Sequence, residues 1–296
     1  MWLAFSGGEI YLRRDLVEIS QCFYDLCRPS IMLFPTNGLM PDLIRRETEN
    51  ILQYCKNSIV VVKLSLDGIG SEHDKFRKTP GNFEKVLETC RQLEPLLDIY
   101  PNFELGVNTT LHSKNQWQIK EIIDYVSSLK NISTHTVSLA RGNLKQESYK
   151  QVDPANYQNA AIHLQQNLKN KIKGTYRFKC ARLKSAQDVL QRQLIHQTLT
   201  SGEKSIPCYA GKLNLVLTET GEVYPCEILP NSFGNVRDHE YDIIKVAHNE
   251  TARQIKNTIS NNNDYCRNCT HECNYMMNIL FNPMMYPALL KEYIKT

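Results

Sequence analysis

The chain has 296 residues, which is enough for one large domain or two ordinary ones. Its hydrophobic content of 42%, charged content of 22% and net charge of +4 are those of a soluble globular protein. No block of Lys and Arg is dense enough to indicate nucleic-acid binding, and no apolar run is long enough to span a membrane. The N-terminus lacks the basic region and cleavage site of a signal peptide. Ten cysteines without a secretory signal fit a reducing cytoplasm, where clustered thiols usually bind metal.

The first half of the sequence alternates strand-like and helix-like segments. The expected strands are 2–5, 31–35, 59–66, 103–111 and 132–139, and the expected helices between them are 15–27, 39–54, 83–97 and 115–129. Asn82 is predicted to be the N-cap of the third of these helices. Alternation at this spacing indicates repeated βα units, so we expect an α/β fold with a five-stranded parallel sheet.

The second half has a different rhythm. Two long polar helices, 154–171 and 183–199, follow each other with no strand between them. A hairpin is then expected, with strands 212–217 and 222–226 joined at Thr220-Gly221. The loop 261–263 leads into a group of cysteines. We place a domain boundary near Gly174.

Five of the ten cysteines lie in the last third of the chain. Two single thiols precede a Cys-x-x-Cys pair and one further cysteine, giving Cys208, Cys226, Cys266, Cys269 and Cys273. Thiolates select zinc, Cu(I) or iron–sulfur clusters, and the spacing alone leaves zinc and a cluster open. Four ligands are needed, and the fourth is either Cys269 or Cys273. Four other cysteines occupy apolar helical positions and are predicted to be core residues: Cys22, Cys27, Cys55 and Cys90.

Two short motifs follow predicted strands. Gly7-Gly8-Glu9 combines a backbone that a ligand can approach closely with a carboxylate that can pair with an ammonium group. Ser65-Leu66-Asp67-Gly68 ends the third strand. Each motif alone is ordinary loop chemistry. Together they lie at the carboxyl ends of parallel strands, the edge at which βα-barrel enzymes carry their active sites.

These motifs resemble those of the radical S-adenosylmethionine (SAM) enzymes. The stretch from Leu3 to Glu9 is similar to the GGE motif, which implies that Gly7, Gly8 and Glu9 hold the SAM amino group. The segment Ser65–Gly68 with His73-Asp74-Lys75-Phe76-Arg77 is similar to the fourth barrel strand of members with a SPASM or twitch domain. The resemblance implies that Ser65 contacts the SAM ribose and that Arg77 contacts its carboxylate. Arg141 falls where the sixth strand delivers a residue to the active site, although an ion pair with a carboxylate is an equal alternative.

The cysteine-rich tail resembles a twitch domain, which is a shortened SPASM domain holding one auxiliary [4Fe–4S] cluster. Glu227 follows Cys226, and in the similar anaerobic sulfatase-maturating enzymes an aspartate at that place takes the substrate proton. A solvated glutamate is the plainer interpretation of Glu227. The implied architecture is a partial parallel βα barrel missing its first unit over residues 1–174, followed by a small twitch-like α+β domain over residues 175–296.

The resemblance has one departure. The family's Cys-x-x-x-Cys-x-x-Cys motif, which holds the SAM-cleaving cluster, does not occur in these 296 residues. We therefore expect a fragment, or a degenerate product, that does not cleave SAM by itself. The family chemistry is formation of a 5′-deoxyadenosyl radical and hydrogen abstraction from a peptide or small molecule, with a reductant such as flavodoxin or ferredoxin. The alternatives are an inactive Fe–S or SAM-binding module or electron carrier, and a zinc-stapled structural domain.

Overall fold

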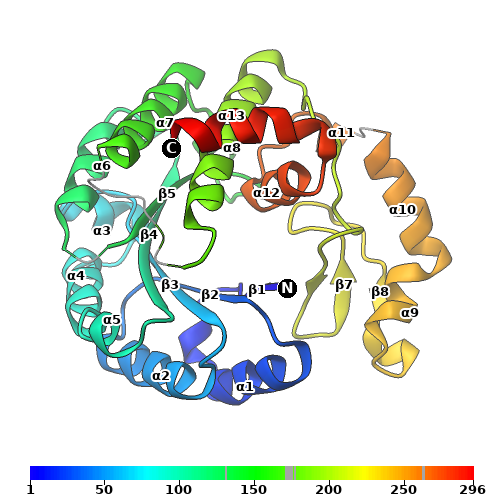
Figure 1. Cartoon of the computed structure of the whole chain (residues 1–296), viewed down its shortest axis with the longest axis horizontal. Coiled ribbons are helices and arrows are strands. Elements are labelled where there is room, and N and C mark those ends of the chain that lie inside the picture. Colours follow the sequence, from blue (N-terminus) through cyan, green and yellow to red (C-terminus); the bar gives the residue numbers. More distant parts are fainter. Residues whose placement is uncertain (131, 171–175, 177, 262–263) are drawn as a thin grey trace. The chain divides into compact units, whose positions relative to one another are not determined.

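The computed structural model describes all residues except 131, 171–175, 177 and 262–263 (Figure 1). The chain divides into two compact units. The first comprises Met1–Ser138 with Ile162–Ser185, and the second comprises Leu139–Ala161 with Ala186–Thr296. The predicted boundary at Gly174 lies outside the described residues, so the division at that position stays a prediction.

The first unit is built around a curled five-stranded sheet whose strands follow one another in the order of the sequence (Figure 1). The strands are β1 (Trp2–Ala4), β2 (Ile31–Thr36), β3 (Ile59–Ser65), β4 (Phe103–Leu111) and β5 (Thr134–Leu139). β1 pairs with β2, β2 with β3 and β3 with β4 in parallel. A parallel pair requires a crossover connection, and helices supply it here. The predicted α/β fold with a partial parallel barrel is confirmed.

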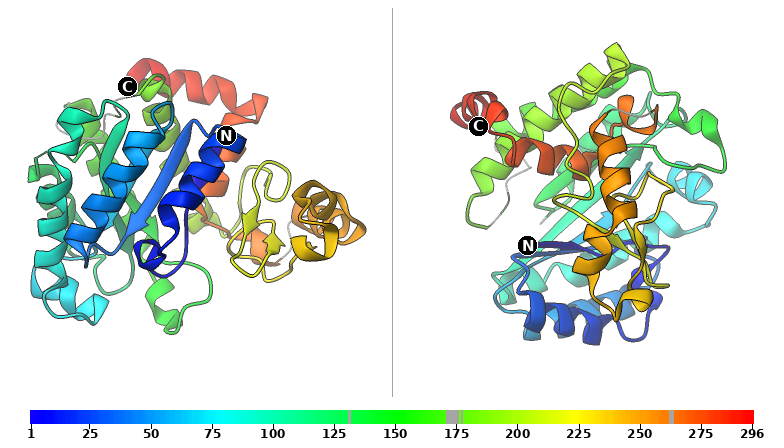
Figure 2. Two further views of the ribbon diagram at one scale, coloured as in Figure 1. Left: turned by 90° about the horizontal axis from the view of Figure 1, so that it is seen from below. Right: turned by 90° about the vertical axis from the view of Figure 1, so that its right-hand side faces the viewer.

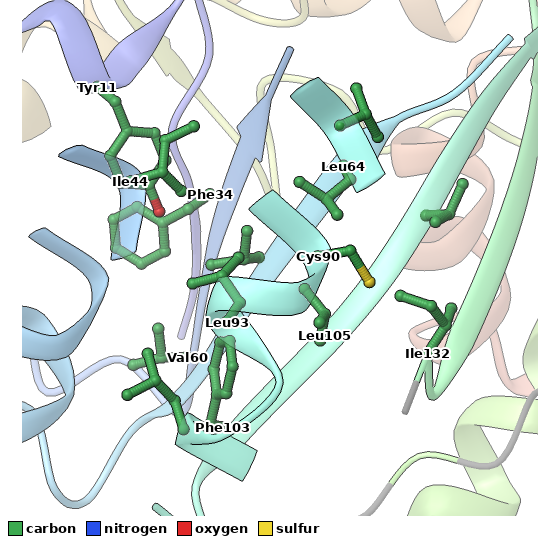
Figure 3. Close-up of a cluster of buried hydrophobic side chains, with 14 of the residues drawn as sticks. Tyr11, Phe34, Ile44, Val60, Leu64, Cys90, Leu93, Phe103, Leu105 and Ile132 are labelled. Carbon is green, nitrogen blue, oxygen red and sulfur yellow. The ribbon is translucent and has the colours of Figure 1, made fainter. Parts of the chain in front are cut away.

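Helices cover one face of this sheet (Figures 1 and 2). They are α1 (Leu16–Cys27), α2 (Pro41–Tyr54), α3 (Ser71–Arg77), α4 (Asn82–Leu93), α5 (Leu96–Ile99) and α6 (Ile119–Ser128). Alternate strand residues such as Phe34, Val60 and Phe103 are fully buried and pack with Ile44 and Leu93 of the helices (Figure 3). Burial of this apolar surface supplies the main free energy that holds the helices against the sheet.

The other face of the sheet carries polar side chains. Lys63, which lies between the buried Val62 and Leu64, donates from Nζ to the hydroxyls of Thr134 at 2.5 Å and Thr136 at 3.2 Å. The alternation follows from the two-residue period of a strand. It places polar groups on the face that the helices do not cover.

The predicted helix 83–97 is interrupted. α4 ends at Leu93 and α5 begins at Leu96, with Pro95 as the residue before α5. The predicted N-cap was also wrong: Asn82 is the first residue of α4, and Gly81 is the cap. The carboxylate of Asp74 accepts instead from the backbone N–H groups of Gly81 and Phe83. The Asn82 side chain is engaged with His73, which is why it does not cap the helix.

The prediction of four core cysteines was half right. Cys55 and Cys90 are buried in the core of the first unit. Cys22 and Cys27 are exposed on α1, whose buried residues are Leu16 and Ser20. The chosen helical face was therefore wrong for α1.

Two long helices follow β5 in the chain and precede the next strand: α7 (Pro154–Lys169) and α8 (Ala181–Ser201). The second unit contains an antiparallel sheet of β6 (Val216–Leu217), β7 (Glu222–Tyr224) and β8 (Gly234–Asn235). β6 and β7 form the predicted hairpin, and β8 was not predicted. Gly221 occupies the turn with φ +90°, a conformation that favours glycine.

Five further helices complete the second unit. They are α9 (Ile243–His248), α10 (Glu250–Ser260), α11 (Asp264–Arg267), α12 (Glu272–Leu280) and α13 (Tyr286–Lys295). Within the described residues, none of the helices has both the length and the apolar character needed to cross a membrane.

Candidate functional site

Glu9 joins the carboxyl ends of the first two strands. One oxygen, Oε1, accepts from the backbone N–H of Tyr11 at 3.2 Å and from the hydroxyl of Thr36 at 3.0 Å. The other, Oε2, accepts from the backbone N–H of Asn37 at 2.7 Å. An ionised carboxylate offers about four acceptor positions, so these three donors fix the group and leave room for one more.

The two glycines before Glu9 lie in open space. A Cβ atom built on Gly7 or Gly8 would meet no atom within 4 Å, and Gly7 has φ +142°. The backbone beside Glu9 is thus accessible to a ligand on a side where a side chain would otherwise stand. This is the arrangement expected for a cationic group that pairs with Glu9.

Arg77 is held in place by a buried carboxylate. Its Nη2 lies 2.6 Å from Oδ2 of Asp67, whose side chain is fully buried. Oδ1 of Asp67 accepts from the backbone N–H of Thr110 at 2.6 Å. Asp67 follows Ser65, the last residue of β3, so Ser65 and the ion pair lie at the same edge of the parallel sheet as Glu9. A guanidinium has five donors, and one ion pair leaves others for a ligand.

Two histidines support the Arg77 segment and were not predicted to matter. Nδ1 of His73 accepts from the backbone N–H of Asp67 at 3.0 Å, and its Nε2 faces Oδ1 of Asn82. Burial lowers the pKa of His73. The ring of Phe76 stacks on His112, with ring centres 3.8 Å apart and planes inclined by 12°. These contacts fix α3 on both sides of the ion pair, a role that sequence periodicity cannot reveal.

Four cysteines of the second unit lie together. Cys208, Cys226 and Cys266 are buried in one small core with Ala210, Leu229 and Ile259. Burial, with the nearby thiols of Cys208, Cys269 and Cys226, raises the pKa of the Cys266 thiol to about 12. Burial also raises the pKa of Cys269, again with contributions from Cys208 and Cys226.

Backbone amides point at two of these sulfurs. The N–H groups of Leu229 and Ile228 donate to Cys226, and the N–H of His271 donates to Cys269. Such donors favour the thiolate over the thiol. The donor set therefore fits a group that binds thiolates.

Cys273 belongs to a different set of neighbours. It is exposed, it bonds with the His271 side chain, and it lies near Arg141. In the described part of the chain, no three His, Cys, Asp or Glu side chains are gathered closely enough to hold a single metal ion.

Glu227 and Arg141 lie near this group. Nε2 of the buried His271 is 3.4 Å from Oε2 of Glu227, whose side chain is 44% exposed. Arg141 forms an ion pair with Glu272, and Oε1 of Glu272 also accepts from the backbone N–H of Leu139 at 3.1 Å. The ion-pair alternative for Arg141 is thus the one observed. The sequence analysis did not single out His271, and its contact with Glu227 is what draws attention to it.

Comparison with known proteins agrees with this arrangement. Residues 208–270 match SPASM, an iron–sulfur cluster-binding domain. The chain is 26% identical over 251 residues to an AdoMet-dependent heme synthase of Methanosarcina barkeri, a match that covers 81% of this chain and 66% of the relative. It is 27% identical over 244 residues to the antilisterial bacteriocin subtilosin biosynthesis protein AlbA of Bacillus subtilis, covering 81% and 47%. The chain therefore spans less than two thirds of the length of either relative.

Solved structures show the same fold. One is anSMEcpe with bound AdoMet, which aligns with a TM-score of 0.58 at 16% identity over 99% of this chain and 79% of that chain. Another is Streptococcus suis SuiB, with a TM-score of 0.56 at 13% identity over 86% and 57%. Fold and cysteine group together define an iron–sulfur protein built on a curled parallel βα sheet.

Together these findings support a radical SAM family with a C-terminal SPASM domain for this chain. Its relatives in this family are enzymes. The family's cofactors, a [4Fe–4S] cluster and SAM, are those that the sequence predicts, and this expectation is confirmed.

Proposed function

We propose that this chain is part of a radical SAM enzyme that abstracts a hydrogen atom from a peptide or small-molecule substrate and holds one auxiliary [4Fe–4S] cluster in its SPASM domain. The observation that carries the proposal is the gathering of four thiols within the residues that match SPASM. When bound, the SAM-cleaving cluster would supply the electron that splits SAM into methionine and a 5′-deoxyadenosyl radical, and the auxiliary cluster would supply an electron acceptor or a ligand site for the substrate.

The auxiliary cluster is assigned to Cys208, Cys226, Cys266 and Cys269. Their thiols influence one another, and backbone amides donate to two of the sulfurs. Cys273 is not a ligand in this proposal, because it faces His271 and Arg141.

The SAM site is assigned to Gly7, Gly8, Glu9, Ser65 and Arg77. Glu9 receives the SAM ammonium on its remaining acceptor position, and the open backbone at the glycines admits the methionyl group. Arg77 is presented to the SAM carboxylate by its ion pair with Asp67. Ser65, at the end of β3, lies at the same edge of the sheet for the ribose.

Glu227 is proposed as the residue that takes the substrate proton. Its carboxylate is partly exposed and lies 3.4 Å from Nε2 of the buried His271, which orients it from the buried side. A carboxylate in such a position provides general-base catalysis. Arg141 is proposed to act through Glu272, by fixing the start of α12, and to bring positive charge near Cys269 and Glu227.

The relatives support two substrate classes. AlbA takes part in subtilosin biosynthesis, and one solved structure of anSMEcpe contains a bound peptide. The heme synthases favour a small molecule. We propose a peptide or a small molecule on these grounds, with flavodoxin or ferredoxin as the electron donor.

The function is tested by SAM cleavage. The 296 residues contain no Cys-x-x-x-Cys-x-x-Cys motif, so with dithionite and SAM we expect no 5′-deoxyadenosine above background from this chain. Supplying the motif before Trp2 is expected to switch cleavage on, and Glu227→Gln is then expected to retain cleavage but lose substrate turnover. Failure of the extended chain to cleave SAM would contradict the proposal. Clear turnover by the 296 residues alone would show that the tail cysteines hold the SAM-cleaving cluster instead.

A further inference from the structure

Lys204 is a buried lysine without a conventional partner. Lys204 is only 7% exposed, and within the described part of the chain its Nζ makes no hydrogen bond. It lies 4.9 Å from the centre of the Tyr275 ring. A buried ammonium is costly unless an opposite charge compensates it, and a cation–π contact supplies only a small part of that compensation. No carboxylate among the described residues lies within ion-pair distance of it.

Lys204 lies close enough to Cys266 and Cys269 to interact electrostatically with both sulfurs. The placement is anchored by the backbone, because the N–H of Lys204 donates to the carbonyl of Arg267 at 2.7 Å. The preceding residue, Glu203, forms an ion pair with the same Arg267. Arg267 lies between Cys266 and Cys269 in the sequence, so the backbone of Lys204 is hydrogen-bonded to the Cys-x-x-Cys segment.

The aromatic neighbour is fixed as well. The hydroxyl of Tyr275 bonds with the hydroxyl of Thr198 at 2.5 Å, which joins α12 to the last turns of α8. Lys204 therefore packs on an oriented ring, and its backbone is bonded to the segment that carries Cys266 and Cys269. Thiolates that hold a cluster would carry the negative charge that is needed to compensate the buried ammonium of Lys204.

We propose that Lys204 is the positioning residue that supplies the charge partner of the auxiliary cluster, neutralising part of its negative charge and raising its reduction potential. The inference rests on the cluster assignment of the proposed function. A [4Fe–4S] cluster on four thiolates becomes one unit more negative when it is reduced, so a fixed cation nearby stabilises the reduced state more than the oxidised one. Lys204 would thereby adjust how readily the site takes up an electron.

The test compares the full chain with Lys204→Met, Lys204→Arg and Lys245→Met after anaerobic reconstitution. Methionine keeps the apolar stem and removes the charge, and arginine keeps the charge. Lys245 is an exposed lysine of the same unit, paired with Glu240, and its substitution changes the net charge equally. The measurements are iron per chain and the midpoint potential from a dithionite titration followed by electron paramagnetic resonance.

We expect Lys204→Met to reduce the ratio of reduced to oxidised cluster about tenfold at the wild-type midpoint, a downward shift of about 59 mV for a one-electron couple. Lys204→Arg and Lys245→Met are expected to stay near the wild-type value. An unchanged potential in Lys204→Met with full iron would overturn the inference while leaving the cluster assignment intact. If Lys204→Met holds no iron, Lys204→Arg decides: retained iron supports the charge requirement, and lost iron refutes it. A wild-type chain that binds no iron would instead refute the proposed function.

Discussion

The buried carboxylate of Asp67 and the guanidinium of Arg77 lie 2.6 Å apart, and Arg77 remains 29% exposed. Arg77 ends the short helix α3, which His73 and Phe76 fix to the rest of the first unit. The ion pair therefore presents the arginine in a set direction before any ligand binds. Such preorganisation reduces the entropy that binding must otherwise overcome.

Removing Arg77 is expected to destabilise the first unit. Arg77→Met leaves the Asp67 carboxylate buried with only the Thr110 N–H as a donor, a loss of about 3 kcal/mol in the free energy of unfolding. Both tryptophans, Trp2 and Trp117, belong to the first unit, so their fluorescence during urea denaturation reports on it specifically. Arg91→Met removes an exposed ion pair with Glu88 and is expected to lose less than about 1 kcal/mol. Equal losses in the two variants would show that the buried Asp67–Arg77 pair contributes no more to the free energy of unfolding than an exposed ion pair does.

Glu9→Gln is expected to weaken SAM binding by about tenfold or more, because a charge-assisted contact to an ammonium is worth roughly 1.5–3 kcal/mol. Isothermal titration calorimetry measures the effect, with Glu18→Gln on the exposed side of α1 as the control. Glu9 also holds Thr36 and Asn37, so tryptophan fluorescence must show that the variant is folded. Undiminished SAM affinity in folded Glu9→Gln would remove Glu9 from the binding site.

The first unit is expected to lose stability as the pH falls from about 6.5 to about 4. Burial lowers the pKa of His112 to about 4, Asp67 opposes this shift and Arg77 adds to it. An unfolded histidine has a pKa near 6.5, so the unfolded state binds the proton first and gains up to about 3 kcal/mol in this range. The contribution of neutral His112 to the stability of the first unit is therefore fully present only above about pH 6.5.

His112→Asn is the variant that isolates this contribution. Nδ1 of His112 accepts from the backbone N–H of Lys114 at 3.1 Å, and an asparagine oxygen can replace that acceptor. Its stability should vary less with pH between 4 and 6.5 than that of the wild type, whereas His248→Asn on the exposed surface of α9 should leave the profile unchanged. A pH profile of His112→Asn identical to the wild type would contradict the assignment.

The α/β fold of the first unit was predictable because strand and helix periods alternate clearly from Trp2 to Leu139. The positions at which helices break and the residues that cap them were not predictable from the sequence. Asn82 is a residue type that favours the N-cap position, but its side chain hydrogen-bonds with the buried His73. Asp74 instead accepts from the backbone N–H of Gly81, seven residues further along the chain. Competition between two partners for one amide depends on tertiary structure and leaves no trace in a local pattern.

The candidate site shows the same limit. The types and spacing of the cysteines indicated a thiolate-bound metal or cluster but left zinc open, and the resemblance of the strand-end motifs favoured the cluster. The proposed choice of Cys269 over Cys273 rests on their neighbours in the structure, because only three residues separate the two in the sequence. Lys204 and His271 were beyond prediction for a related reason: nothing in sequence distinguishes a buried lysine from the many exposed ones.

The most direct test of the cluster assignment is the iron and sulfide content of the anaerobically reconstituted full chain, compared with its Cys269→Ser and Cys273→Ser variants. We predict about four irons per chain in the wild type and in Cys273→Ser, and a large loss in Cys269→Ser, with circular dichroism confirming that all three are folded. One zinc and no iron in the wild type, or iron lost from Cys273→Ser and retained in Cys269→Ser, would contradict the account.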